Sequence, residues 1–169
     1  PRPTLRHTLF PYTTLFLSIQ YIICGLLVIF ILGILLSGHA KNVSFETVQQ
    51  NIVSCEGINT LKKGTARDMR KNLDLDESLF DWSIYYCGNG LMDVSELLIV
   101  KSDNSAALET AEKAAASRLD AQKTNFDGYG TNQIDLLGHA ITKKVGPYYF
   151  YAVSEHASTW EEVFMGLVK

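Results

Sequence analysis

Residues 94–101, VSELLIVK, predict a central β-strand, because apolar side chains occupy both faces of an extended segment. A strand that is apolar on both faces is typical of the centre of a sheet, where neighbouring elements cover both sides. Residues 82–87, WSIYYC, are rich in aromatic side chains and predict a second strand. Gly88, Asn89 and Gly90 between them give a turn signal, so we expect the two strands to pair as a hairpin.

A second hairpin follows further along the chain. Residues 140–145 and 148–154 flank Gly146 and Pro147, which predicts a turn between two more strands. Apolar residues at intervals of three and four, preceded by capping side chains, predict helices beside these strands. These helices are expected at residues 44–52, 65–73 and 105–125, and from Ser158, where S-x-x-E forms a capping box. Residues 132–138 are expected to form a short helix or a turn. The order of elements predicts an α+β domain with an antiparallel sheet of about four strands, covered by helices.

An apolar segment precedes this domain. From Ile19 to Leu36 the chain reads IQYIICGLLVIFILGILL, without a charged residue. As a helix this segment is ~27 Å long, close to the ~30 Å hydrocarbon core of a bilayer, so it predicts a single transmembrane helix. Cleavage after Ala40 is the alternative, because Gly38 and Ala40 have the spacing of a signal-peptide site. The run is longer than a typical signal core, which favours an uncleaved anchor in the lipid bilayer.

The first residues have a different character. Residues 8–18, TLFPYTTLFLS, resemble the translated sequencing-adapter sequence TLFPYTTLFRS and depart from it only at Leu17. We therefore interpret residues 1–18 as a non-native leader from sequence assembly, with a genuine leader containing Pro and Thr as the alternative. The expected layout is then a leader at 1–18, an anchor at 19–37, a short linker at 38–43 and an α+β domain at 44–169.

Charge and cysteine content limit the classes of function. The chain carries 18 acidic and 15 basic residues, and its lysines and arginines form no cluster. A nucleic-acid partner is therefore not expected. Cys24 lies in the apolar run, whereas Cys55 and Cys87 are either two core thiols or a disulfide.

The sequence holds no complete motif for a cofactor, a metal or a nucleophile. Asp74, Asp76 and Ser78 match three positions of a calcium loop, but Leu79 replaces the required Gly and Tyr85 the required Glu. We therefore predict no metal site, no cofactor and no catalytic residue. The alternative is a hydrolytic site assembled from dispersed residues, for which Glu96, Asp93 and His139 are the candidates.

Aromatic residues supply the candidate binding surface. Tyr149 and Tyr151 share one face of the last predicted strand, and Phe126 and Tyr129 lie in the loop after the longest helix. The alternatives are that a helix covers the strand face and that the loop aromatics close a helix end.

From VSELLIVK at 94–101, through the R-x-x-x-Q segment at 118–122 and Tyr129, to the Gly146-Pro147-Tyr148 turn and Phe164, the chain resembles a known family. It is similar to a domain-of-unknown-function family of small lipoproteins or membrane-anchored proteins from Gram-positive, Firmicutes-type bacteria. The resemblance covers residues 45–169 and implies an extracytoplasmic location, but no activity. The lipid-attachment cysteine of such proteins is absent, so a transmembrane helix would replace the lipid.

These observations lead to two hypotheses from different classes. The first is a single-pass, outward-facing α+β domain that binds an envelope protein or glycan of a bacterial cell. The second is an envelope hydrolase whose site assembles from dispersed residues. A cleft in which two carboxylates, or a histidine and a carboxylate, converge with shifted pKa values would favour the hydrolase, whereas a flat or aromatic-lined surface would favour the binding module.

Overall fold

The computed structural model describes residues 12–36 and 40–169, and within the first helix the side chains of residues 19–31. The chain divides into two units, the first ending at Gly38 and the second beginning at His39. In the first unit, α1 (Tyr12–Leu36) includes the whole predicted apolar helix. Within the part of the chain that the structure describes, no helix combines the length and the apolar character needed to cross a membrane. The transmembrane role of α1 stays a prediction.

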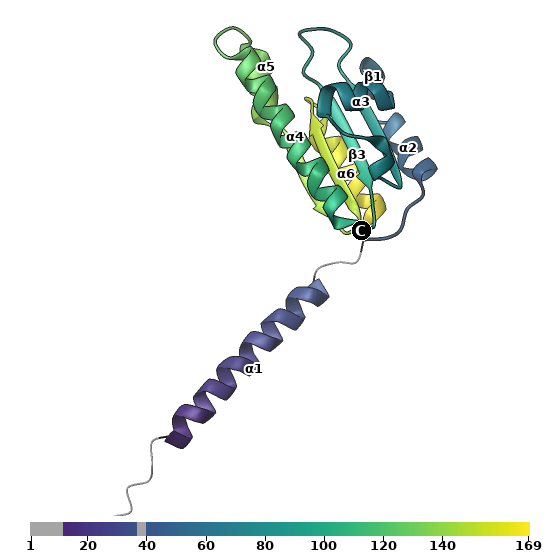
Figure 1. Cartoon of the computed structure of the whole chain (residues 1–169). Coiled ribbons are helices and arrows are strands. Elements are labelled where there is room, and N and C mark those ends of the chain that lie inside the picture. Colours follow the sequence, from purple (N-terminus) through teal and green to yellow (C-terminus); the bar gives the residue numbers. More distant parts are fainter. Residues whose placement is uncertain (1–11, 37–39) are drawn as a thin grey trace, which may run out of the picture. The chain divides into compact units, whose positions relative to one another are not determined.

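The second unit is built on one antiparallel sheet of five strands (Figure 1). Its spatial order is β1-β2-β3-β5-β4, so β3 is the central strand, as its sequence predicts. Both predicted hairpins, β2 with β3 and β4 with β5, are confirmed, and β3 and β5 pair in the middle of the sheet. The strands are β1 (Lys62–Lys63), β2 (Trp82–Cys87), β3 (Glu96–Lys101), β4 (Ile141–Val145) and β5 (Tyr148–Val153).

The prediction of about four strands was one strand short. The missed strand, β1, consists of two exposed lysines that pair with Cys87 and Tyr86 at one edge of the sheet. Two residues carry no alternating pattern, so only the tertiary pairing with β2 makes this segment a strand.

Helices cover both faces of the sheet, which confirms the predicted α+β architecture (Figure 1). Successive strand residues point to opposite faces, so Leu98 and Tyr151 belong to one core, and Ile99 and Phe150 to the other. The first core is covered by α3 (Ala66–Leu73), α4 (Ser105–Phe126) and α5 (Thr131–Gly138). The second is covered by α2 (Phe45–Val53) and α6 (Ala157–Val168).

The helix starts mostly follow the predicted caps. Ser44 caps α2, and at α3 Thr65 and Asp68 form a capping box. The predicted start of α6 was wrong by two residues, because the helix is capped at His156 and begins at Ala157, so Ser158 lies inside it. The backbone N–H of Ala157 donates to the Ser154 carbonyl, and that of His156 to the Ser154 hydroxyl. The turn therefore starts before Ser158.

Residues 40–43 lie at one end of the sheet, and Glu96 lies at the other. At one end Lys101 pairs with Tyr148, whose hydroxyl accepts from the N–H of Val43 at 2.8 Å. The N–H of Lys41 donates to the Val168 carbonyl at 2.8 Å, so residues 40–43, predicted as linker, lie against the domain at this end. At the opposite end Glu96 opens β3, between Cys87 and Val153.

Candidate functional site

A charged residue is buried where β3 begins. Glu96 is only 1% exposed, although it belongs to the central strand of the sheet. The Arg118 Nε from α4 lies 3.3 Å and 3.4 Å from its two carboxylate oxygens. The Tyr85 hydroxyl from β2 donates to Glu96 Oε1 at 2.7 Å, and Asn72 Nδ2 from α3 donates to that hydroxyl at 3.0 Å. Four elements thus contribute one polar side chain each to a connected network.

Burial dominates the electrostatics of this network. Loss of hydration raises the pKa of Glu96 above its ordinary value, although Arg118 and the Tyr85 hydroxyl both act to lower it. Burial also raises the pKa of Tyr85, and the neighbouring Glu96 carboxylate raises it further. The same two causes, in the same order, raise the pKa of Tyr151 on β5. The carboxylate is therefore held in a poorly hydrated environment that Arg118 only partly compensates.

An open cavity of about 260 Å³ lies beside the Glu96–Arg118 pair. One wall is formed by the last two turns of α4, and another by the connection between β2 and β3. The polar and aromatic side chains of the lining include Asn72, Asp93, Glu96, Arg118, Gln122, Asn125 and Phe126. Glu96 and Cys87 place this cavity at the end of the sheet opposite residues 40–43.

Gln122 makes this cavity distinctive. The residue lines the cavity and is only 5% exposed, yet its Oε1 atom is buried and has no hydrogen-bond partner among the described residues. A buried polar atom without a partner costs about 1–3 kcal/mol, so folded proteins rarely keep one without a reason. The position follows Arg118 by one helical turn, which puts both side chains on the same face of α4. Trp82 Nε1 and the hydroxyls of Tyr149 and Tyr151 are also buried without a partner, but of these four atoms only Gln122 Oε1 belongs to a residue that lines this cavity. An acceptor in this position can receive a hydrogen bond from a ligand.

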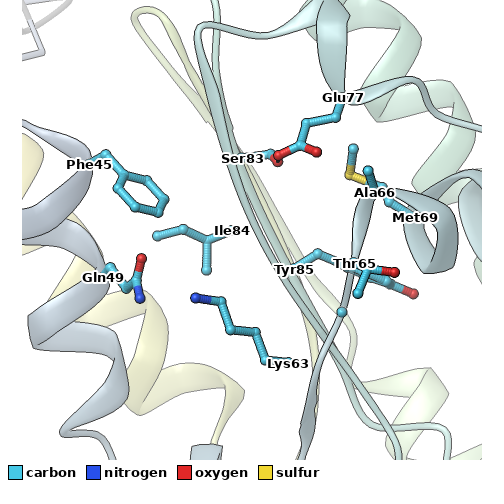
Figure 2. A pocket seen from close by; sticks show the side chains of 11 residues that line it. Phe45, Gln49, Lys63, Thr65, Ala66, Met69, Glu77, Ser83, Ile84 and Tyr85 are labelled. Carbon is cyan, nitrogen blue, oxygen red and sulfur yellow. The ribbon is translucent and has the colours of Figure 1, made fainter.

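A second cavity, of about 190 Å³, lies between α2, β1 and α3 over the edge of β2 (Figure 2). Figure 2 shows Ser83 beside Glu77, where the Ser83 hydroxyl donates to Glu77 Oε1 at 3.2 Å. Thr65 in the same lining is paired with Asp68 in the capping box of α3. Among its described lining residues no side chain has a buried polar atom without a partner. The cavity beside Glu96 is therefore the stronger candidate.

The four aromatic residues predicted as a binding surface have different environments. Tyr149 and Tyr151 are 2% and 0% exposed in the core beneath α4, so they do not form an exposed platform. Phe126 lines the cavity beside Glu96 and is 8% exposed. Tyr129 is 66% exposed, and its ring centroid lies 5.8 Å from that of Phe126. Of these four residues only Phe126, which the structure places at the end of α4 rather than in the loop, lines the cavity.

The three residues named for a hydrolytic site are only partly brought together. Glu96 and Asp93 line the same cavity, but the Asp93 carboxylate accepts hydrogen bonds from the backbone N–H groups of Asn89 and Ser95. His139 lines a different cavity, together with Ser158 and other residues of that region. The histidine is therefore not placed to exchange a proton with Glu96.

Other predicted sites can be located as well. The Asp76 carboxylate accepts from the N–H of Ser78 and caps the short 3₁₀ helix η2 (Glu77–Leu79), a structural role. No group of three metal-binding side chains occurs among the described residues. Cys55 and Cys87 are both free thiols, so the alternative of a disulfide between them was wrong.

Sequence reasoning missed Arg118, Gln122 and Tyr85 as site residues. The usable signals were a glutamate opening a strand that is otherwise apolar on both faces, and an Arg and a Gln four residues apart on the buried face of a helix. Neither signal says that the two segments meet, because β3 and α4 lie in the same core only through the tertiary fold.

Comparisons with known proteins give one match. No curated protein and no solved structure matches the chain. A family model described as a domain of unknown function, DUF4358, matches residues 54–154, more than half of the chain. This segment contains Glu96, Arg118 and Gln122, and it confirms the predicted resemblance to a family of unknown function; the lipoprotein and Gram-positive details stay predictions. The chain therefore belongs to the DUF4358 family.

Proposed function

We propose that this protein is a membrane-anchored binding module of the bacterial cell envelope, with its α+β domain outside the cytoplasm. Its ligand occupies the cavity beside Glu96 and Arg118. One observation carries the proposal: the Gln122 amide oxygen is buried without a partner in the wall of an open cavity that also holds an ion pair between the buried Glu96 carboxylate and the partly exposed Arg118. Proteins keep such costly groups where they contact ligands.

The anchor is the part of this proposal that rests on sequence. The uncharged run from Ile19 to Leu36 has the length of a bilayer-spanning helix. The cavity lies at the end of the sheet opposite residues 40–43, which follow the anchor in the sequence. Secretion after cleavage near Ala40 is the competing outcome.

Hydrolysis is the second candidate function, and one observation favours it. The pKa of Glu96 is raised by burial, which is the change that lets a carboxyl group act as a general acid near neutral pH. The absence of a free second carboxylate counts against it, because Asp93 is bonded to its own loop. Binding without chemistry is therefore the better-supported function.

Site-specific photocrosslinking tests the binding function. A photoreactive amino acid is placed at Leu91, a fully exposed residue on the cavity rim, in the full chain expressed in a Gram-positive host. The matched control carries the same group at Lys144, an exposed position on β4 away from the cavity. We expect an adduct from the Leu91 position and none from Lys144. No adduct at Leu91, or equal adducts at both positions, would contradict the proposal.

Labelling in intact cells tests the anchor and its orientation. Cells that express the double variant Lys144→Cys, Cys55→Ser are treated with a membrane-impermeant maleimide. We expect the label to reach the introduced thiol without permeabilisation, and the protein to stay in the membrane fraction after a wash at high pH. A label that requires permeabilisation would refute the outward orientation, and release of a shortened chain into the medium would identify cleavage near Ala40.

A further inference from the structure

We propose that the ligand in this cavity is a neutral sugar unit of a glycan, held by hydrogen bonds to its hydroxyl or acetamido groups. The inference rests on the proposed binding function and assigns it a chemical class of ligand. It follows from the size of the cavity, from its charge, from the donors and acceptors in its wall and from one aromatic side chain.

The size of the cavity limits the ligand to one small unit. Its volume of about 260 Å³ lies below the 300–1,000 Å³ that is typical of pockets for drug-sized molecules. One end opens toward solvent beside the fully exposed Leu91. A single ring of a longer chain fits this description, because the rest of the chain continues past the rim.

The charges in the wall exclude an anionic ligand. Among the described lining residues the charged side chains are Asp93, Glu96 and Arg118. The positive charge of Arg118 is already compensated by the Glu96 carboxylate, so the wall offers no excess positive charge to a phosphate or a carboxylate. An anion would also meet two carboxylates in the same cavity, which is unfavourable where hydration is poor.

The remaining polar groups suit a ligand whose groups both donate and accept. Gln122 Oε1 needs a donor, whereas the Arg118 Nη groups, which have no protein partner among the described residues, need an acceptor. Asn125, exposed on the same wall, can do either with its amide. A hydroxyl group combines both roles, and a sugar presents several on adjacent carbons. An acetamido group has an N–H that can donate to Gln122 Oε1 and a C=O that can accept from the Arg118 Nη groups.

Phe126 supplies the apolar part of the site. It lies in the cavity wall at the end of α4, beside the polar groups. A sugar ring has an apolar face of C–H groups, and such a face packs favourably against an aromatic ring. The combination of planar polar side chains and one ring distinguishes this cavity from one built for a hydrophobic molecule.

Binding to three tetrasaccharides tests the assignment. The full chain in detergent micelles is titrated by calorimetry with neutral chitotetraose, with its cationic deacetylated form and with anionic tetragalacturonate. We expect chitotetraose to bind, and tetragalacturonate to show no measurable binding. Equal binding of the anionic sugar, or tighter binding of the cationic one, would overturn the inference.

Substitution of Gln122, with a matched control, separates a binding role of this residue from a structural one. Gln122→Met removes the orphaned oxygen, so affinity for chitotetraose should fall about tenfold while the temperature of unfolding does not fall. Gln49→Met, in the second cavity, is the matched control and should keep its affinity within about twofold. Unchanged affinity in Gln122→Met would overturn the inference. If Gln122→Met also lowers the temperature of unfolding, Asn125→Ala is measured instead, because this exposed side chain can be removed without unfolding the domain. Unchanged affinity of Asn125→Ala for chitotetraose would then overturn the inference.

The failures of the two proposals are distinguishable. If no tetrasaccharide binds but the photoreactive group at Leu91 captures a protein, the sugar assignment fails and the binding function stands. If no sugar binds and Leu91 gives no adduct, both fail. If chitotetraose is shortened during the titration, the hydrolytic function replaces simple binding.

Discussion

Replacing Arg118 by Met should show that this residue compensates the buried Glu96 carboxylate. The closest nitrogen–oxygen distance is 3.3 Å, and Glu96 has only 2% of its side chain exposed, against 28% for Arg118. At that distance and an effective dielectric constant of about 20, the attraction is about 5 kcal/mol. Folding of the Arg118→Met variant no longer desolvates a guanidinium group, and this saving offsets part of the lost attraction. We expect a loss of about 3 kcal/mol in the free energy of unfolding at pH 7.

The pH dependence has a defined sign. Without Arg118 the pKa of Glu96, already raised by burial, should rise further. A carboxyl group whose folded-state pKa is raised stabilises the fold at low pH, and this contribution is lost as pH rises through the raised value. The deficit of Arg118→Met relative to the unmodified protein should therefore be larger at pH 8 than at pH 5.

Urea unfolding followed by circular dichroism measures these differences in a four-member cycle. The members are the unmodified protein, Arg118→Met, Glu96→Gln and the double variant, in which the neutral amide should recover at least about 2 kcal/mol. Lys113→Met is the matched control, because it removes an exposed cation from the same helix and should change stability by less than about 0.5 kcal/mol. If Arg118→Met costs no more than the control, or if its deficit is the same at pH 5 and pH 8, the compensation argument is refuted.

Three further predictions concern the fold. Leu98→Ala, in the fully buried centre of β3, should cost about 3 kcal/mol in urea unfolding, whereas Leu79→Ala, at a position 44% exposed, should cost less than about 1 kcal/mol; similar losses would contradict the central role of β3. Asp68 has its pKa lowered from 3.8 to about 2 by hydrogen bonds from Thr65 and then Lys62, so the stability from its ionised form is present above pH 3.8 and is lost as pH falls through about 2. Thermal unfolding of Asp68→Asn should accordingly lose less stability between pH 4 and pH 2 than the unmodified protein, and an identical slope would count against the capping box. Gly64→Ala would place a Cβ in steric conflict with the Tyr85 ring, and should lower the melting temperature by displacing that ring; an unchanged melting temperature would show that the ring moves freely.

Most of the local elements of this protein could be predicted from its sequence. The boundaries of β2 matched its aromatic run, and α4 ended within one residue of its predicted limit. Such elements are predictable because hydrophobic period, capping side chains and turn residues act within a few positions of each other. The central place of β3 was predictable for a related reason: a strand that is apolar on both faces needs covering elements on both sides.

Other features depend on contacts between segments that are distant in the sequence. The two-residue strand β1 exists only through its pairing with β2, and the start of α6 was set by hydrogen bonds to Ser154 rather than by the capping box at Ser158. The cavity assembles Glu96 from β3 with Arg118 and Gln122 from α4. Periodicity states which face of each element is buried, but not which buried faces meet. Their meeting depends on how helices and strands distant in sequence pack around a shared core.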